Sequence, residues 1–141
     1  MRGETYGAEL ATNYKVSSYL MFKGSYSLLR MALHGYPGGA GSLSETAEGK
    51  SPRNQIYAGA FLTLPKSFEL STHAYFVGKL STFHLPSYTR LDVNIAWKAL
   101  ETVELSVAAQ NLLGSHTEFG PEEGALNPVK PTIYGKVGWR F

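Results

Sequence analysis

Apolar and polar residues alternate one by one along seven stretches of this chain, and this period of two constrains the fold more than any other feature. Successive side chains of a β-strand point to opposite faces of a sheet, so the alternation predicts strands with one apolar and one polar face. No stretch shows the period of an amphipathic helix. The approximate bounds of the predicted strands are Glu4–Val16, Tyr19–Met31, Gln55–Leu64, Phe68–Lys79, Tyr88–Trp97, Thr102–Leu112 and Thr132–Phe141.

The connections between the predicted strands alternate in length. Short turns on one rim and long loops on the other are typical of outer-membrane β-barrels. If the short turns are periplasmic, the first strand runs toward the periplasm and the final Phe141 lies at that rim. The short connections are Ser17–Ser18, Pro65–Ser67 and Lys98–Glu101, and the long ones are Ala32–Asn54, Leu80–Ser87 and Gly114–Pro131.

The composition excludes several classes of protein. The chain has 141 residues, enough for one domain, and its mean hydropathy of −0.15 is too polar for a helical membrane protein. No apolar run approaches the roughly 18 residues of a transmembrane helix, whereas the alternating faces of a β-barrel average out. Cysteine is absent, which excludes disulfides and thiolate chemistry. The net charge of +2 gives no reason to expect a nucleic-acid partner.

The positions of the aromatic residues favour lipid as the surroundings of the apolar face. Alternation alone also fits a soluble barrel or sandwich with its apolar face inside. Along these strands, however, aromatic side chains gather toward the two ends, as they do at the headgroup levels of a bilayer. The predicted aromatic girdle at the short-turn end comprises Tyr14, Phe22, Phe68, Trp97 and Trp139, with Phe141 beyond, and Tyr6, Tyr26 and Phe76 form the opposite belt.

The number of predicted strands indicates an incomplete barrel. Single-chain bacterial barrels have an even number of strands, starting at eight. An open sheet edge in lipid leaves N–H and C=O groups unpaired, each at a cost of several kcal/mol. The sequence therefore predicts an all-β, antiparallel, transmembrane segment of about seven strands that belongs to a larger barrel.

The chain resembles the C-terminal end of the β-barrel of TonB-dependent outer-membrane receptors. The likeness spans nearly all of the chain, and it depends on the order and spacing of motifs that are individually weak. The motifs are Gly3–Leu10 followed by Gly24–Leu29, then Ser51–Gln55, then Tyr88–Val93 leading through Trp97 to Glu104–Ser106, Asn111–Leu113 and His116–Phe119, and last Gly138–Phe141.

This resemblance implies a fold and a function. Such receptors have a 22-stranded barrel filled by an N-terminal plug, and they import ferric siderophores, cobalamin, haem or glycans with energy delivered through TonB. Residues 1–141 would be the C-terminal portion of the barrel, in the bacterial outer membrane, without plug, TonB-binding segment or N-terminal barrel strands. The implied partners are outer-membrane lipid, the rest of the barrel and plug, an iron chelate or similar ligand, and TonB through the missing N-terminal part only.

The last predicted strand also resembles the signal that the barrel-assembly machinery reads. That signal has a terminal aromatic residue preceded by hydrophobic residues at alternate positions, which Phe141, Trp139 and Val137 match. The usual glycine would fall at Lys136, and here Gly135 lies one position earlier. The assembly machinery is therefore an expected partner, although the same residues also fit an ordinary lipid-facing girdle.

No catalytic constellation is evident, and we expect a transport protein that is not an enzyme and needs no cofactor or metal. No two histidines have the spacing of a zinc site. The candidate ligand contacts are loop residues, for which exposed loop polarity is the alternative interpretation. They are His34, Tyr36, His84 and His116.

The polar rows of the strands are predicted to line the barrel lumen. His73, between Ser71 and Tyr75, is expected to form a hydrogen bond within the wall. Arg90 and Asp92 share the polar face two residues apart. Glu104, Lys136 and Arg140 could pair across neighbouring strands as a stabilising charge ladder, or contact the plug or a transported anion.

Three other functions fit parts of the pattern. A stand-alone barrel of about eight strands would need a further strand within Leu43–Ser51. An outer-membrane lipid-modifying enzyme would need a Ser/His/acid cluster, for which His84 near Ser81 and Ser87 is the one hint. A soluble β-sandwich that binds a ligand would fold in plain buffer without detergent.

Overall fold

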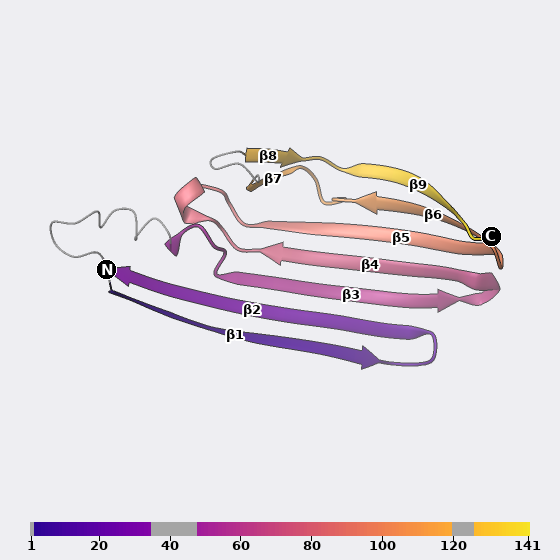
Figure 1. Cartoon of the computed structure of the whole chain (residues 1–141), viewed down its shortest axis with the longest axis horizontal. Coiled ribbons are helices and arrows are strands. Elements are labelled where there is room, and N and C mark those ends of the chain that lie inside the picture. Colours follow the sequence, from indigo (N-terminus) through magenta and orange to yellow (C-terminus); the bar gives the residue numbers. More distant parts are fainter. Residues whose placement is uncertain (1, 35–47, 120–125) are drawn as a thin grey trace.

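The computed structural model describes residues 2–34, 48–119 and 126–141. Within these ranges the chain is all-β, and seven strands form one antiparallel sheet in the order β1-β2-β3-β4-β5-β6-β9 (Figure 1). Each of the seven predicted strands is present, which confirms the fold class at this level. The bounds are β1 (Arg2–Lys15), β2 (Leu20–His34), β3 (Asn54–Leu64), β4 (Phe68–Val77), β5 (Tyr88–Leu100), β6 (Val103–Gln110) and β9 (Thr132–Trp139).

Three tight connections lie at one end of the sheet, on the right in Figure 1. Between β1 and β2, the Ser17 hydroxyl accepts a hydrogen bond from the backbone N–H of Leu20 at 3.1 Å. Between β3 and β4, the 3₁₀ turn η1 (Pro65–Ser67) turns the chain by placing Lys66 and Ser67 at φ of 61°. A register shift between Lys98 and Leu100 precedes the third turn. The predicted division into a short-turn end and a loop end is therefore confirmed.

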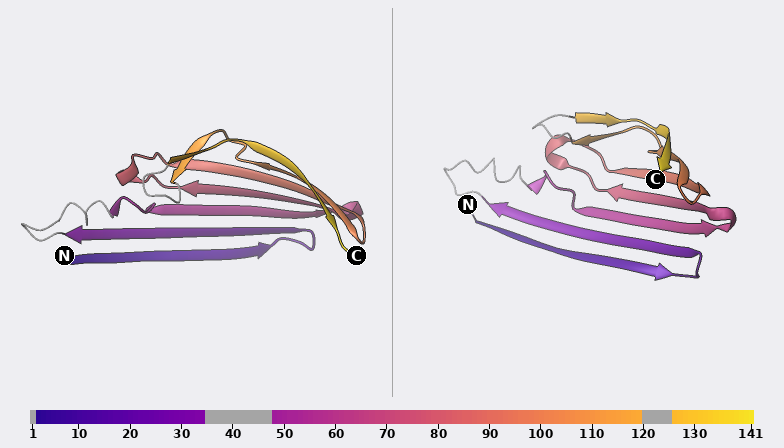
Figure 2. Two further views of the ribbon diagram at one scale, coloured as in Figure 1. Left: turned by 45° about the horizontal axis from the view of Figure 1, so that its top comes forward. Right: turned by 45° about the vertical axis from the view of Figure 1, so that its right-hand side comes forward.

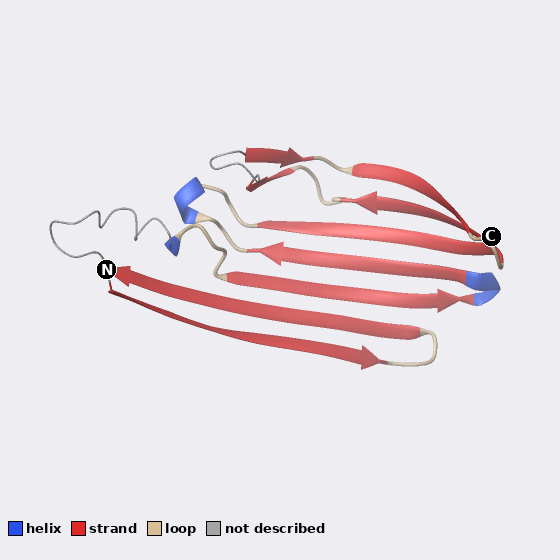
Figure 3. Ribbon diagram, in the orientation of Figure 1, coloured by secondary structure: helices blue, strands red, loops and turns tan. Residues whose placement is uncertain are grey.

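The loop end contains elements that the sequence pattern does not predict. The segment expected to be a loop from Gly114 to Pro131 holds a two-stranded sheet of β7 (His116–Phe119) and β8 (Leu126–Val129). These strands have four residues each, too few for a clear alternation, and Pro128 lies within β8. The connection between β4 and β5 holds a second 3₁₀ turn, η2 (Ser81–Phe83) (Figure 3). Most of the segment Leu43–Ser51 lies outside the described residues.

The described strands form a single curved layer (Figure 2). Among the described residues, the buried hydrophobic side chains are Leu85 and Ala108 alone. Both edges, β1 and β9, are unpaired within the described part of the chain. A layer that buries neither face lacks the packing that stabilises a globular domain in water.

None of the helical segments that the structure describes is both long and apolar enough to cross a membrane.

Candidate functional site

One face of the sheet, here called the apolar face, is free of charge over most of its width. It consists of alternate residues, and it has no charged side chain on β3, β4, β5, β6 or β9. Many of its side chains are exposed, with Ile133 and Val137 each 71% accessible. Its rows are Ile56/Ala58/Ala60/Leu62/Leu64, Phe68/Leu70/Thr72/Ala74/Phe76, Leu91/Val93/Ile95/Trp97, Val103/Leu105/Val107/Ala109 and Ile133/Gly135/Val137/Trp139.

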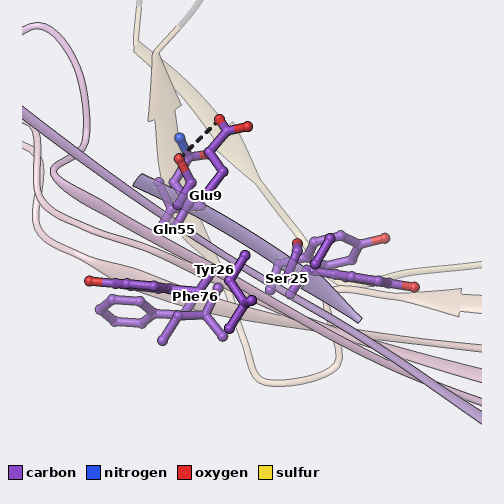
Figure 4. Close-up of a pocket in the computed structure, with 12 residues that line it drawn as sticks. Glu9, Ser25, Tyr26, Gln55 and Phe76 are labelled. Carbon is purple, nitrogen blue, oxygen red and sulfur yellow. Dashed lines mark hydrogen bonds between the residues drawn. The ribbon is translucent and has the colours of Figure 1, made fainter. Parts of the chain in front are cut away.

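The close-up in Figure 4 shows how sharply the two faces differ. Tyr26 and Phe76 lie on one side of the sheet, and Glu9 and Gln55 lie on the other. On the polar side, Ser27 Oγ donates a hydrogen bond to Glu9 at 3.5 Å. The residues drawn in Figure 4 line a shallow pocket. Because they come from both faces of one layer of strands, this pocket is open and is not a ligand cavity.

The predicted aromatic girdle forms a diagonal row on the apolar face. Tyr14 pairs with Phe22 across β1 and β2. Phe68 pairs with Trp97 across β4 and β5, and their ring centroids stack 5.4 Å apart with planes within 5°. Trp139 closes the row on β9 with 72% of its surface exposed. The structure therefore brings all five predicted girdle residues to one end of one face.

The register gives the slope of this row. The ladder from Phe22 leads through Ala60 to Thr72, and Phe68 lies four residues nearer the short turn. The ladder from Trp97 leads through Leu105 to Val137, and Trp139 lies two residues further in the same direction. The total shift is six residues over the six steps from β1 to β9, which is one residue per strand on average.

A shift of one residue per strand corresponds to a defined tilt. One residue advances about 3.3 Å along a strand and one strand step is about 4.8 Å, which gives a tilt of about 35°. Strands of transmembrane barrels tilt by roughly 35–45° from the barrel axis. A row with this slope would therefore lie at a single height around such a barrel.

Of the three residues predicted for the opposite belt, Tyr6 on β1 and Phe76 on β4 lie at the loop end of the apolar face. The interval from Tyr6 to Tyr14 on β1 is eight residues, and the interval from Phe68 to Phe76 on β4 is also eight. Eight residues at a 35° tilt span about 22 Å along the axis, close to the apolar band of about 25 Å on barrel proteins. The prediction was wrong for Tyr26, which pairs with Leu10, four residues nearer the short turns than Tyr6, and donates its hydroxyl to Asn54 Oδ1 at 2.8 Å.

The polar face has an aromatic cluster near its centre. The Tyr57 hydroxyl and His73 Nδ1 are 3.0 Å apart, which confirms that His73 forms a hydrogen bond on the polar face of the sheet. Tyr75 packs beside Tyr57 with ring centroids 5.2 Å apart, and Lys23 Nζ lies 4.9 Å from the centroid of the Phe61 ring. The cluster ties β2, β3 and β4 together through side chains.

A second polar group, here called the Asn111 network, lies at the loop end. Asp92 is the acceptor at its centre, because it binds Arg90 through both carboxylate oxygens and also accepts the Asn111 backbone N–H at 2.9 Å. The Arg90–Asp92 contact confirms that these two residues share a face. Asn111 is 1% exposed and has a φ of 57°, a conformation that asparagine adopts more readily than most residues.

His116 and Tyr88 complete the Asn111 network. The two rings stack with centroids 4.0 Å apart, and the His116 nitrogens contact Asn111 Oδ1 at 3.0 Å and Glu118 Oε1 at 2.8 Å. Tyr88, the first residue of β5, lies on the loop side of the apolar band. Burial, followed by the charge of Glu118 and the hydrogen bond with it, raises the pKa of Tyr88 to about 12.

The remaining candidate residues lie apart from one another. His84 is exposed at the end of η2, His34 ends β2, and Tyr36 lies outside the described residues. The side chain of His116 is 9% exposed and is engaged within the protein. The ligand contacts proposed for these residues stay predictions. The same holds for the assembly signal, of which Val137 and Trp139 lie on the apolar face.

Sequence reasoning assigned Asn111 a structural place in a motif but did not identify it as the hub of a buried network. Its position directly after a strand, where asparagine often reverses the chain, was the available signal.

Register places Glu104 opposite Gly138, between Lys136 and Arg140 on the neighbouring strand. Among the described residues, no group of three or more His, Asp or Glu side chains could hold a metal ion.

Neither a protein-family profile nor a curated protein sequence matches this chain.

Proposed function

We propose that this chain forms part of the lipid-facing wall of an outer-membrane β-barrel, and that the barrel belongs to a TonB-dependent receptor that imports an iron chelate or a similarly bulky nutrient. The observation that carries the membrane part is the aromatic row on a face without charged side chains on β3 to β6 and β9, with its average shift of one residue per strand. A sheet covered by protein does not need its aromatic residues to follow the tilt of a barrel, whereas lipid headgroups lie in a plane.

The exposure of the apolar face supports lipid as its surroundings. Soluble monomers rarely expose contiguous apolar patches above a few hundred Å². Here the exposed large side chains extend from Leu10 on β1 to Trp139 on β9. Lipid tails cover such a face with no requirement for a complementary protein layer, which agrees with the single layer of strands.

The two sheet edges support a barrel with further strands. Because seven strands alternate in direction, β1 and β9 run the same way, and closing them on each other would require a parallel pair. An odd number of additional strands would pair with both edges in antiparallel fashion and would give an even total. The even number typical of bacterial barrels would then be satisfied.

The receptor part of the proposal is supported by the sequence resemblance and by the placement of all long connections at one end of the sheet. In this arrangement the polar face lines the lumen next to a plug, and the loop end faces outward. The chain would contribute wall and loops, the barrel-assembly machinery would insert it, and TonB would act through a different part of the receptor.

Tryptophan fluorescence tests the membrane part directly. Trp97 and Trp139 are the two tryptophans of the chain, and they lie on different strands of the same diagonal row. Trp97→Phe and Trp139→Phe each leave a single reporter in lipid vesicles that contain phospholipids brominated at different acyl-chain depths. Both reporters should be quenched most by the shallowest bromines. Quenching at clearly different depths, or none, would contradict the proposed orientation.

Growth of cells tests the transport part. Deletion of the gene that encodes this chain should abolish growth on at least one iron chelate supplied as the sole iron source, whereas growth on a readily available iron salt should be unchanged. Unchanged growth on a broad panel of chelates would contradict a role in iron uptake. The membrane part of the proposal would then still be tested by the fluorescence experiment alone.

A further inference from the structure

The β7–β8 hairpin depends on side chains for its attachment to the main sheet. In Figure 1 it extends beyond the loop ends of β6 and β9, and the structure assigns it to a separate two-stranded sheet. The contacts that join it to β5 and to the end of β6 run through the Asn111 network. Its attachment is therefore sensitive to the state of a few polar groups.

The hydrogen bonds fix the orientation of the Asn111 amide. Its Nδ2 donates to the backbone oxygen of Val129 on β8 at 2.9 Å, and a carbonyl oxygen can only accept. The amide oxygen must therefore face His116, whose Nδ1 lies 3.0 Å away. Through its backbone N–H, the same residue is bound to Asp92 on β5. Asn111 thus connects both hairpin strands to the main sheet.

This orientation places His116 between two acceptors. Nδ1 faces the amide oxygen of Asn111, and Nε2 faces a carboxylate oxygen of Glu118 at 2.8 Å. A neutral imidazole carries one N–H and can satisfy only one of them, whereas the imidazolium donates from both nitrogens. Loss of the proton would leave a nitrogen lone pair directed at an oxygen lone pair in a largely buried site.

We propose that the Asn111 network is a proton-dependent latch, which holds the β7–β8 hairpin against the sheet while His116 is an imidazolium and loosens it when that proton is lost. The charged and titratable groups around the ring are Glu118 on β7 and Tyr88, Arg90 and Asp92 on β5. Arg90 is paired with Asp92, and Glu118 is the charged group whose oxygen contacts the ring.

The sign of the pH dependence follows from the protonated form. The latch is complete while His116 carries both N–H groups, and it weakens as the pH rises and one of these protons is lost. Every contact in the latch lies within the described chain, so the inference does not depend on the proposed membrane function.

Hydrogen–deuterium exchange read by mass spectrometry tests the latch in the folded, detergent-solubilised chain. Exchange times are scaled for the intrinsic pH dependence of amide exchange, and peptides from β4 serve as the internal reference. Between pH 5 and pH 8, the exchange rate in β7 and β8 should rise about tenfold relative to β4. A tenfold change corresponds to the weakest contribution expected of a hydrogen bond to a charged group.

Two variants separate the latch from general effects. His116→Gln should make hairpin exchange fast and independent of pH, while protection of β4 is unchanged. His84→Gln removes an exposed histidine outside the network and should behave as the unmodified chain. Equal hairpin protection at both pH values in the unmodified chain would overturn the proposal, and so would the full pH response in His116→Gln. The first result needs no variant, so it stands even if a substitution impairs folding.

Discussion

The apolar face and the Asn111 network share strand β5 but are stabilised in opposite ways. The apolar face makes few contacts that bury it and leaves side chains such as Val137 exposed. The Asn111 network, at the loop end of β5, satisfies its buried polar atoms through contacts within the chain. Among the described residues, no buried side-chain N or O lacks a hydrogen-bond partner. One region therefore needs a surrounding medium, and the other is complete within the chain.

This difference shows that the two faces of β5 have different roles. Val93 and Trp97 point to the face that we assign to lipid, while Arg90 and Asp92 point to the face that holds the loop end in place. Substitutions on the two faces should consequently respond to different conditions. Changes on the apolar face should depend on lipid, and changes in the network should depend on polar partners and pH.

The largest expected effect comes from a charge at the centre of the apolar face. Val93 pairs with Thr72, which lies midway between Phe68 and Phe76. Val93→Arg should destabilise the protein in lipid by about 2–4 kcal/mol, the cost of arginine at the bilayer midplane. Asn94→Arg, one residue away on the polar face, should cost well under half of that. Urea unfolding in vesicles measures both, and equal costs would remove the distinction between the faces.

The next largest effect should follow loss of the network hub. Asn111→Ala leaves the Val129 oxygen and a His116 nitrogen without partners, and it puts alanine, which adopts positive φ less readily than asparagine, at a φ of 57°. We expect a cost of about 2–3 kcal/mol, because an unsatisfied buried group costs about 1–3. Asn111→Gly removes the same hydrogen bonds and relieves the backbone, so it should be about 1 kcal/mol less harmful than alanine. Protection of the β7–β8 hairpin from hydrogen exchange measures the cost of each variant. Equal costs for Asn111→Ala and Asn111→Gly would show that the backbone at this position is unstrained.

A smaller effect is expected from the stacked pair on the girdle. Phe68→Leu keeps an apolar side chain beside Trp97 but removes the ring contact. The cost should be about 0.5–1.5 kcal/mol, with a change in Trp97 fluorescence that Trp139→Phe makes easier to resolve. Phe76→Leu at the other end of β4 is the matched control, and its Trp97 spectrum should not change.

The smallest effect at neutral pH is expected from the Tyr88 hydroxyl. Its pKa is raised to about 12, so the neutral phenol is favoured in the folded state. The associated stability is present below the ordinary tyrosine pKa of about 10 and is lost as pH rises through 12. The ultraviolet titration of the unmodified chain minus that of Tyr88→Phe should show one phenol ionising near 12. A difference curve centred near 10 would contradict the burial of this hydroxyl.

The sequence by itself determined the seven long strands and their two faces. A period of two is a local property, because neighbouring side chains of any extended strand alternate. The same periodicity located His73 and the Arg90–Asp92 pair on the polar face. It failed for β7 and β8, because four residues, with Pro128 among those of β8, give no readable period. The attachment of these strands to the main sheet also depends on Asn111, which is distant along the chain from Val129.

Only the tertiary structure decided the register and the network. Register joins residues far apart in sequence, and a slip of two positions would preserve every alternation while destroying the slope of the aromatic row. The roles of Asn111 and His116 likewise arise where β5, β6 and the hairpin meet, because hydrogen-bond direction is set by all partners together. Alternation thus specifies what each strand presents, and the pairing of strands specifies what those residues do.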